Sequence, residues 1–355
     1  MSLFIDFHVL QTVPPSCVNR DDTGSPKTAV YGGTVRSRVS SQAWKHAMRI
    51  DFQSLFAKEE LGSRTKYLVD MVAAEIQAQN SSLDTEKCKK LANEALKDAG
   101  ISLKDDKTEA LFFMSCKQAQ KLAELALNDA LEKKEKKDAF KNVLKENPSV
   151  DIALFGRMAA SDPTLNCDAA AQVAHAISTH AVQTEYDYFT AVDDLQADDN
   201  AGAGHLGTVE FNSATLYRYA NINADELKST LGAEKVAKTV RCFAESFIRS
   251  MPTGKENTFA NRTLPDAVYI TIRSDQPVNL CGAFEKTVKE SADGFAAASE
   301  QCLTAYAKKV YSRFAAEPEK AFCIGDSLAE IAESLSMPCL LDALEQAVTE
   351  RMSEV

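Results

Sequence analysis

Side chains suited to binding phosphate are concentrated in one stretch near the amino terminus, VYGGTVRSRVSSQAWKHAMR, residues 30–49. Ser40 or Ser41 can cap a helix there, because a serine oxygen accepts an unpaired N–H of the first turn. The polar residues that follow recur at helical spacing and share one face, namely Gln42, Lys45, His46 and Arg49. A solvated amphipathic helix would explain Lys45 and Arg49, but not Arg36 and Arg38 just before it. Arginine, serine and glutamine donors are typical of phosphate and sugar contacts, so the segment predicts nucleic-acid binding.

The charge of this region is opposite to that of the whole chain. Residues 1–50 hold six Lys or Arg against three Asp, whereas the complete chain has a net charge of −11 at pH 7. A basic patch on an acidic body indicates a polyanion that is held at one defined place. If Arg36, Arg38, Lys45 and Arg49 each neutralise a phosphate of a single strand, binding should have a salt slope of about −3.

Composition favours an intracellular globular protein. A length of 355 residues predicts two domains, or one domain with a large insertion. The start MSLFIDFHVL has no basic n-region, and no apolar run reaches the length of a membrane span. The nine cysteines form no CxxC pair, so we expect reduced thiols in a cytoplasmic protein without membrane contact.

Other chemistry has weaker support. GAGHLG, residues 202–207, fits a dinucleotide pattern but is followed by a strand instead of a helix, which favours a flexible turn. The five histidines lack zinc-site spacing, and no cysteine or serine lies in a nucleophile motif. The acid pairs Asp21–Asp22 and Asp193–Asp194 could hold a metal, but paired acids in loops are more often solvated. We therefore predict no cofactor, no metal and no enzyme activity.

Hydrophobic periodicity predicts an α+β fold with an insertion. Alternation indicates strands at 3–13, 34–39, 173–179, 208–222 and 267–273, and helical spacing indicates helices near 233–250, 284–314 and 327–352. Residues 56–147 are rich in Ala, Lys, Glu and Leu and predict three or four helices. The expected arrangement is one discontinuous domain, 1–55 and 148–355, interrupted by a helical insertion at 56–147.

Several motifs in this order resemble one known family. They are NRDD (19–22), the segment 30–49, DIALFGRM (151–158), AHAISTHAV (174–182), FTAVDDL (189–195) and HLGTVEFNSATLYRYANIN (205–223). Together they resemble the CasC-type backbone subunit of Cascade, the type I-E CRISPR surveillance complex of the RAMP superfamily. The resemblance implies an RRM-like or ferredoxin-like palm, helical fingers, and a β-hairpin thumb at about 193–223. It also implies copies that stack along a CRISPR RNA in a helical filament, each thumb kinking out a base at regular intervals.

The resemblance assigns roles to individual residues by their motif positions. The RNA backbone contacts would be Ser40, Gln42, Lys45, His46 and Arg49, with Arg20 and Lys27 as additional contacts from the preceding loop. The family tends to have a basic residue at the position of His46. A histidine at this position would make the contact with RNA weaker. Met158 and Leu206 match apolar residues that pack against bases beside the kink, and Phe189, Thr190, His205 and Gly207 belong to the thumb.

The expected function is a non-catalytic backbone subunit for CRISPR interference. Its expected partners are CRISPR RNA, target DNA through that RNA, further copies of itself, and the large, small, 5′-end cap and RNA-processing subunits of Cascade. Two alternatives stay open. One is a metal-dependent RNA-cleaving subunit of the type III kind that uses Asp21 and Asp22. The other is a generic single-strand RNA-binding module, which would protect RNA without a period.

Overall fold

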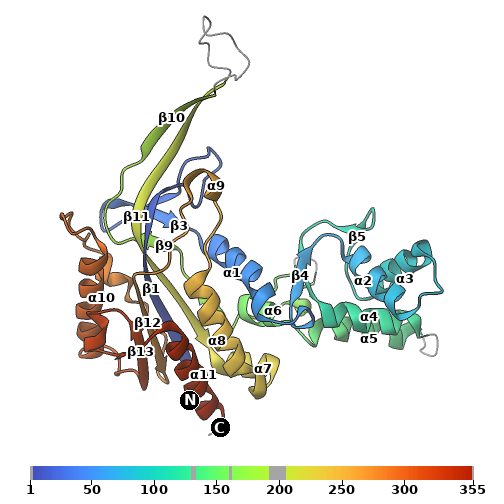
Figure 1. The fold of residues 1–355 in the computed structure, drawn as a ribbon. Helices are drawn as coiled ribbons and strands as arrows, with labels where there is room; N and C mark the ends of the chain where they lie inside the picture. The colour runs from blue at the N-terminus through green and yellow to red at the C-terminus, as the bar shows by residue number, and fades with distance from the viewer. Residues whose placement is uncertain (1–2, 129–132, 160–161, 192–204, 354–355) are drawn as a thin grey trace, which may run out of the picture.

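The computed structural model describes residues 3–128, 133–159, 162–191 and 205–353, and its centre is one large sheet (Figure 1). The strand order is β14–β13–β12–β1–β11–β9–β3–β2, with β8 and β10 also paired to β11. All pairs are antiparallel except β13–β14. The strands are β1 (Phe4–Ser16), β2 (Thr28–Tyr31), β3 (Thr34–Val39), β8 (Ala171–Val173), β9 (Ala176–Ser178), β10 (Glu185–Ala191), β11 (His205–Asn223), β12 (Ala267–Arg273), β13 (Lys320–Ile324) and β14 (Glu333–Ser334).

Helices cover both faces of this sheet, and we call the sheet with these helices the palm. The face with the larger apolar core packs against α1 (Ser41–Leu55), α6 (Val150–Phe155), α7 (Ala224–Leu231), α8 (Ala233–Arg249) and α11 (Met337–Ser353). Phe7 of β1 and Phe243 of α8 meet there with ring centroids 5.2 Å apart. The opposite face is covered by α10 (Ala296–Tyr311) and the 3-10 helix η3 (Leu280–Phe284). Short elements complete the palm, namely α9 (Glu256–Phe259) and η4 (Leu328–Glu330).

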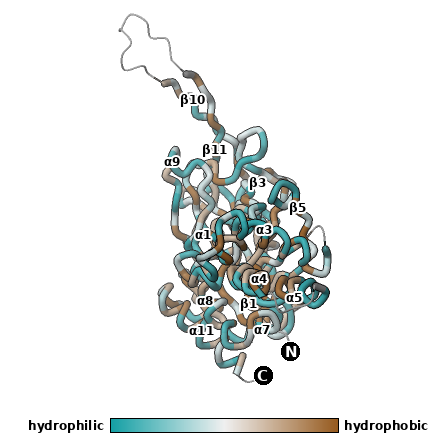
Figure 2. Tube along the Cα trace, turned by 90° about the vertical axis from the view of Figure 1, so that its right-hand side faces the viewer, coloured by the Kyte–Doolittle hydropathy of each residue, from teal (hydrophilic) through white to brown (hydrophobic). Residues whose placement is uncertain are grey.

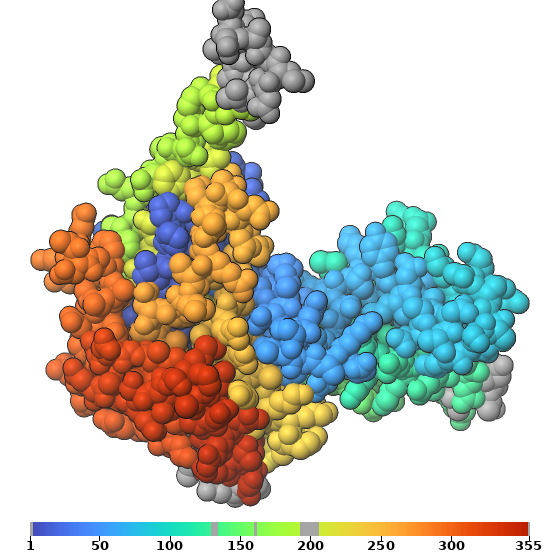
Figure 3. Space-filling model, in the orientation of Figure 1, coloured from blue at the N-terminus to red at the C-terminus, as the bar shows by residue number. Residues whose placement is uncertain are grey.

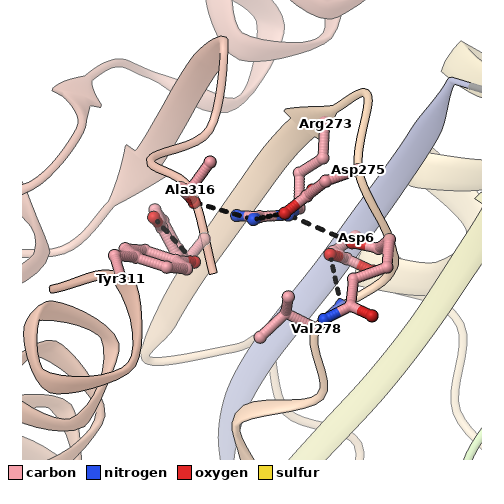
Figure 4. A network of polar contacts seen from close by, with 8 residues as sticks. Asp6, Arg273, Asp275, Val278, Tyr311 and Ala316 are labelled. Atoms are coloured by element: carbon pink, nitrogen blue, oxygen red, sulfur yellow. Dashed lines mark hydrogen bonds and ion pairs between the residues drawn. The ribbon is translucent and has the colours of Figure 1, made fainter. Parts of the chain in front are cut away.

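The face under α10 contains buried polar side chains (Figure 4). The Asp6 carboxylate accepts a hydrogen bond from the Tyr219 hydroxyl at 2.7 Å, and burial raises the pKa of Asp6 to about 6. Burial lowers the pKa of His8, two residues along β1, to about 3. Arg273 lies beside them and pairs with Asp275 at 2.8 Å. These groups make the electrostatics of the palm interior sensitive to pH.

The insertion folds around a core of its own, and we call it the fingers. It contains α2 (Leu68–Gln79), α3 (Thr85–Asp98), α4 (Cys116–Leu127) and α5 (Lys133–Lys145), with the short elements η1 (Lys58–Glu60), β4 (Gly62–Thr65), β5 (Leu103–Lys104), β6 (Lys107–Thr108), β7 (Phe112–Ser115) and η2 (Pro163–Leu165). Four helices agree with the prediction, but the strands of two to four residues were not predicted, because so short a run has no measurable period. Ala159 and Leu165 join this core from beyond position 147. Figure 3 shows the fingers standing apart from the palm.

A long hairpin projects from the sheet on the side away from both termini, and we call it the thumb (Figures 1 and 2). It consists of β10 and the first half of β11, with Glu185 opposite Phe211 and Ala191 opposite His205. The second half of β11 pairs with β1, so one strand runs from the thumb into the palm. The first thumb strand therefore starts at Glu185, before the predicted position 193. Residues 192–204, including Gly202 and both Asp193 and Asp194, lie outside the described residues.

The fold mixes helices with a mostly antiparallel central sheet, in agreement with the α+β class that was expected. The face of α1 that was predicted to bind phosphate lies between the palm and the fingers. That face is the natural place to look for a site.

Candidate nucleic-acid interface

Helix α1 begins where the sequence predicts. Ser40 is the N-cap, and its hydroxyl accepts a hydrogen bond from Ala43 N at 3.3 Å. The Ser40 backbone N–H donates to Asn19 Oδ1 at 2.9 Å, which ties the loop containing Arg20 and Lys27 to the helix start. Ser40 is buried, so it orders the helix and presents little surface to a ligand. Its predicted role as a direct backbone contact has no support in this geometry.

The polar face of α1 lines a cleft of about 600 Å³ between palm and fingers. Four predicted residues meet there, Gln42, Lys45, His46 and Arg49, and the predicted base-packing residue Met158 joins them. The opposite face of the helix is buried in the palm through Trp44, Ala47, Met48 and Phe52. Met158 is 83% exposed, which rules out core packing as its role. The structure thus brings the cationic face of α1 and the exposed side chain of Met158 into the same cleft.

Two cations on α1 have different surroundings. Lys45 Nζ lies 5.6 Å from the ring centre of Phe155, and burial lowers the pKa of Lys45. Arg49 Nε lies 3.2 Å from Asp151 Oδ2, and its guanidinium stacks on Phe113 at 4.3 Å. Burial raises the pKa of Asp151, opposed by hydrogen bonds and by Arg49. Arg49 therefore already has a carboxylate partner, whereas among the described residues Lys45 has no ion pair.

The prediction that Arg36 binds a phosphate is wrong for this fold. Arg36 is completely buried, and its guanidinium donates to the backbone oxygens of Ser178 and Phe284, each at 2.8 Å. Two further bonds go from Nε to Thr34 Oγ1 at 2.8 Å and from Nη2 to Glu285 O at 3.3 Å. Segments far away in the sequence cover this side chain. The alternating pattern of residues 34–39 alone could not show that Arg36 would be buried. Arg36 holds β3 and β9 against η3.

Arg38, Arg20 and Lys27 form a second group, outside the cleft. Arg38 donates to Thr28 O at 3.1 Å and lies 3.1 Å from His175 Nδ1. Burial lowers the pKa of His175, and the charges of Arg38 and Lys27 lower it further. A neutral His175 can accept the Arg38 hydrogen bond. Lys27 and Arg38 line a small hollow beside Asn19, while Arg20 is exposed in the loop.

The thumb presents apolar side chains on its surface. In the register of the hairpin, Thr190 lies opposite Leu206 and Phe189 lies opposite Gly207. A Cβ atom at Gly207 would lie 2.3 Å from Phe189 Cζ, so the ring packs directly over the glycine. Leu206 is 56% exposed, consistent with a contact outside this chain. His205 pairs through its backbone with Ala191.

Comparison with known proteins decides the family. The family model described as CT1975-like protein matches residues 5–347. The chain belongs to the CT1975-like protein family. It superposes on a chain of a structure described as "CRISPR RNA-guided surveillance complex, pre-nicking" with a TM-score of 0.82 and 31% identity, covering 97% of this chain and 100% of that chain. A chain of a "CRISPR RNA-guided surveillance complex" gives a TM-score of 0.64 and 30% identity over 97% and 99% of the two chains.

These similarities confirm the resemblance to a Cascade backbone subunit and make this CT1975-like protein a CRISPR surveillance complex subunit. Comparison with curated protein sequences gave no match. In the part of the chain that the structure describes, no helix is long and apolar enough to cross a membrane.

Among the cleft residues of this CT1975-like protein that escaped sequence analysis, three lie on the finger side, namely Arg64, Leu111 and Phe113. They form the finger wall, opposite α1. Arg64 is exposed on β4, and Leu111 is 50% exposed. The only sequence signal was the alternation of Arg64 with Lys66, which is too short to distinguish from an ordinary solvated strand. Tyr186 and Tyr188, exposed on the same thumb face as Leu206, were also not singled out.

The acid pair near the amino terminus forms part of a turn. Asp21 Oδ1 accepts hydrogen bonds from Thr23 N at 2.9 Å, Thr23 Oγ1 at 2.7 Å and Ser25 N at 3.0 Å. The Thr23 hydroxyl is the first cause that lowers the pKa of Asp21. Among residues 3–128, 133–159, 162–191 and 205–353, no group of three or more His, Cys, Asp or Glu is placed to hold a metal ion.

Proposed function

We propose that this protein is a backbone subunit that binds CRISPR RNA through its sugar-phosphate backbone, in the cleft between palm and fingers. The observation that carries the proposal is the meeting of Lys45, Gln42 and the exposed Met158 in that one cleft. Cations and amides recognise phosphate and sugar without reading sequence. An apolar side chain can replace lost stacking beside a displaced base without reading its identity.

The finger wall adds to this proposal. Arg64 faces the cleft opposite α1, so a strand between the two walls would meet cations on both sides. Leu111 and Phe113 supply apolar surface next to Met158. A groove with this mixture is typical of sequence-tolerant single-strand binding. Because the base edges stay free, the RNA and not the protein would select target DNA by pairing.

We further infer an RRM-like palm and a filament of several copies. The antiparallel centre β12–β1–β11 with α1 and α8 on one face supports the RRM-like description. The projecting thumb with exposed Leu206 supports a contact beyond this chain, at a kinked base and on the next copy. The proposed partners are CRISPR RNA, target DNA through that RNA, further copies, and the large, small, cap and processing subunits of Cascade. We place the complex in the cytoplasm, whose reducing conditions suit nine free cysteines.

We also propose that the subunit is not itself a nuclease. The engagement of Asp21 by its own turn supports this, because an oxygen that accepts three hydrogen bonds is a poor metal ligand. The test is incubation of assembled complexes with complementary RNA and Mg²⁺ or Mn²⁺. Cleavage by the parent that is lost in the double variant Asp21→Asn, Asp22→Asn would establish the type III-like alternative.

The main experiment is nuclease footprinting of a CRISPR RNA in complexes purified through this subunit. Protection at a regular spacing, with the period lost when residues 192–204 are deleted, is the expected result. Protection without a period would indicate a generic single-strand binding module. Absence of bound RNA would exclude the proposed function.

A further inference from the structure

The chain first enters the fingers at Gly62 and first returns to the palm at Ser149, and one buried carboxylate contacts both of these crossings. Asp151, at the start of α6, accepts a hydrogen bond from Gly62 N at 3.0 Å, where the chain enters β4 of the fingers. It also accepts one from the Ser149 hydroxyl at 2.6 Å, where the chain returns to the palm. The Asp151 side chain is 3% exposed. Both crossings are therefore anchored to a single group.

The third partner of Asp151 is the cleft cation Arg49. Its Nε lies 3.2 Å from Asp151 Oδ2, and its Nη2 donates to Gly62 O at 3.4 Å. The same guanidinium stacks on Phe113 of β7 at 4.3 Å. Arg49 thus extends from the palm helix to two finger strands, and at 23% exposure it still forms part of the cleft wall.

The backbone at this junction is closely packed. A Cβ atom at Gly62 would lie 2.7 Å from Ser149 Oγ and 2.9 Å from Met114 O. The crossing strands therefore approach more closely than any side chain at position 62 would allow. A small displacement of one crossing must be transmitted to the other.

We propose that Asp151 is a positioning residue that fixes the angle between fingers and palm and so sets the width of the cleft. The inference rests on the proposed function for its effect on RNA, although its effect on geometry is independent of any ligand. A cleft that is fixed before binding avoids the cost of ordering its walls around the ligand. Asp151→Asn keeps one oxygen that can accept from Gly62 and Ser149, but it places an amide NH2 where Oδ2 meets Arg49, so the link from the palm helix to the two crossings is lost.

Electrostatics alone predicts the opposite effect of Asp151→Asn on RNA affinity. The two explanations can therefore be distinguished by experiment. Deleting a negative charge beside a phosphate site strengthens anion binding, because the Coulomb repulsion between the carboxylate and the phosphate is removed. Asp168 supplies the matched control, because it lines the same cleft, is exposed, and among the described residues its side chain has no hydrogen bond or ion pair with either crossing. Asp168→Asn should therefore bind RNA as tightly as the parent or more tightly. Asp151→Asn, which removes the same charge, should bind at least about fivefold more weakly.

The geometry is measured without RNA. Spin labels are attached at Glu86→Cys in the fingers and Glu234→Cys in the palm, after the exposed Cys302 and Cys339 are changed to Ser. Asp151→Asn should broaden or shift the distance distribution, whereas Asp168→Asn should leave it unchanged. Arg49→Gln should give the same broadening, and the double variant Asp151→Asn, Arg49→Gln should be no worse than either single one. Ser149→Ala, which keeps the charge, provides a milder variant if Asp151→Asn does not fold.

Unchanged distances in Asp151→Asn or, failing that, Ser149→Ala would overturn the proposal. Tighter RNA binding by Asp151→Asn, equal to that of Asp168→Asn, would also overturn it. If the parent binds no RNA while the distances still change, the proposed function fails and the positioning role of Asp151 stands.

Discussion

Lys45 and Arg49 lie one turn apart on α1, but they differ in whether a carboxylate already balances their charge. The charge of Arg49 is balanced by Asp151 at 3.2 Å. Lys45 is partly desolvated against Phe155, as its lowered pKa indicates, and among the described residues it has no carboxylate partner. A desolvated cation without a counterion gains most from an incoming phosphate. Lys45 should therefore contribute more to RNA affinity than Arg49 does.

Lys45→Ala should weaken RNA binding about tenfold, which corresponds to about 1.4 kcal/mol. The loss should be the same for RNAs of unrelated sequence, because a phosphate contact reads no base. Filter binding of three unrelated single strands measures it, with Lys309→Ala on α10 as the control. A loss that depends on base sequence would contradict backbone recognition.

Two neighbours on β1 make opposite contributions to the pH dependence of stability. Burial raises the pKa of Asp6 from 3.8 to about 6, so its contribution is fully present below pH 3.8 and is lost as pH rises through about 6. Burial lowers the pKa of His8 from 6.5 to about 3, so its contribution is present above pH 6.5 and is lost as pH falls through about 3. Between pH 4 and pH 6 the two slopes oppose each other. Stability should consequently change little in that window on account of this pair.

Single substitutions should separate the two opposing slopes of the free energy of unfolding against pH. With Asp6→Asn, His8 acts alone, and the free energy of unfolding should rise from pH 4 to pH 6 relative to the parent. With His8→Gln, Asp6 acts alone, and the free energy should fall over the same range. Each slope is at most about 1.4 kcal/mol per pH unit. Urea unfolding at several pH values measures both, and slopes of equal sign would contradict the assignment.

At the scale of elements, the thumb depends on a glycine that an aromatic ring covers. Gly207→Ala would place a Cβ within 2.3 Å of Phe189 and force the ring outward. We expect faster amide exchange in β10 and in the first half of β11, and loss of periodic RNA protection. Binding in the cleft should weaken less than about threefold. Thr208→Ala, next in the strand and exposed, is the control and should preserve the period.

The elements with strong periodicity were predictable, and those defined by distant partners were not. Helix α8 was predicted at 233–250 and lies at Ala233–Arg249, and the strand predicted at 267–273 is β12. Each has a long apolar pattern of a single period. The strand predicted at 173–179 is instead split into β8 and β9, which pair with different parts of β11. Strand pairing with a distant segment such as β11 cannot be seen in the sequence pattern of residues 171–178 themselves.

The same distinction applies to the site. Gln42, Lys45 and Arg49 share a helix face, so their meeting follows from local spacing. Arg36 is buried because the carbonyls of Phe284 and Ser178, more than a hundred positions away, fold over it. Asp151 was part of a quoted motif, but its partners at Gly62 and Arg49 become visible only when both crossings are in place.

At the scale of the whole molecule, the proposed RNA would have to bind to an acidic body whose described cleft offers few uncommitted cations. The net charge is −11, and of the four cations counted from sequence, Arg36 is buried and Arg49 is paired. Arg38 and Lys45 remain, and Arg64 on the finger wall adds a third. Three phosphates neutralised on a single strand give a salt slope of about −2 per subunit, not the −3 expected from sequence.

That slope predicts an affinity loss of about 16-fold per subunit between 50 and 200 mM salt, instead of about 50-fold. Arg64→Ala should reduce the slope to about −1.4, because it removes one phosphate contact. Arg36→Met should leave the slope unchanged while lowering stability, since its buried hydrogen bonds are lost. Titration of the purified subunit with a short single-stranded RNA at four salt concentrations measures each slope. A parent slope near −3 would mean that Arg49 exchanges Asp151 for a phosphate when RNA binds, and the cleft would then be held differently in the bound state.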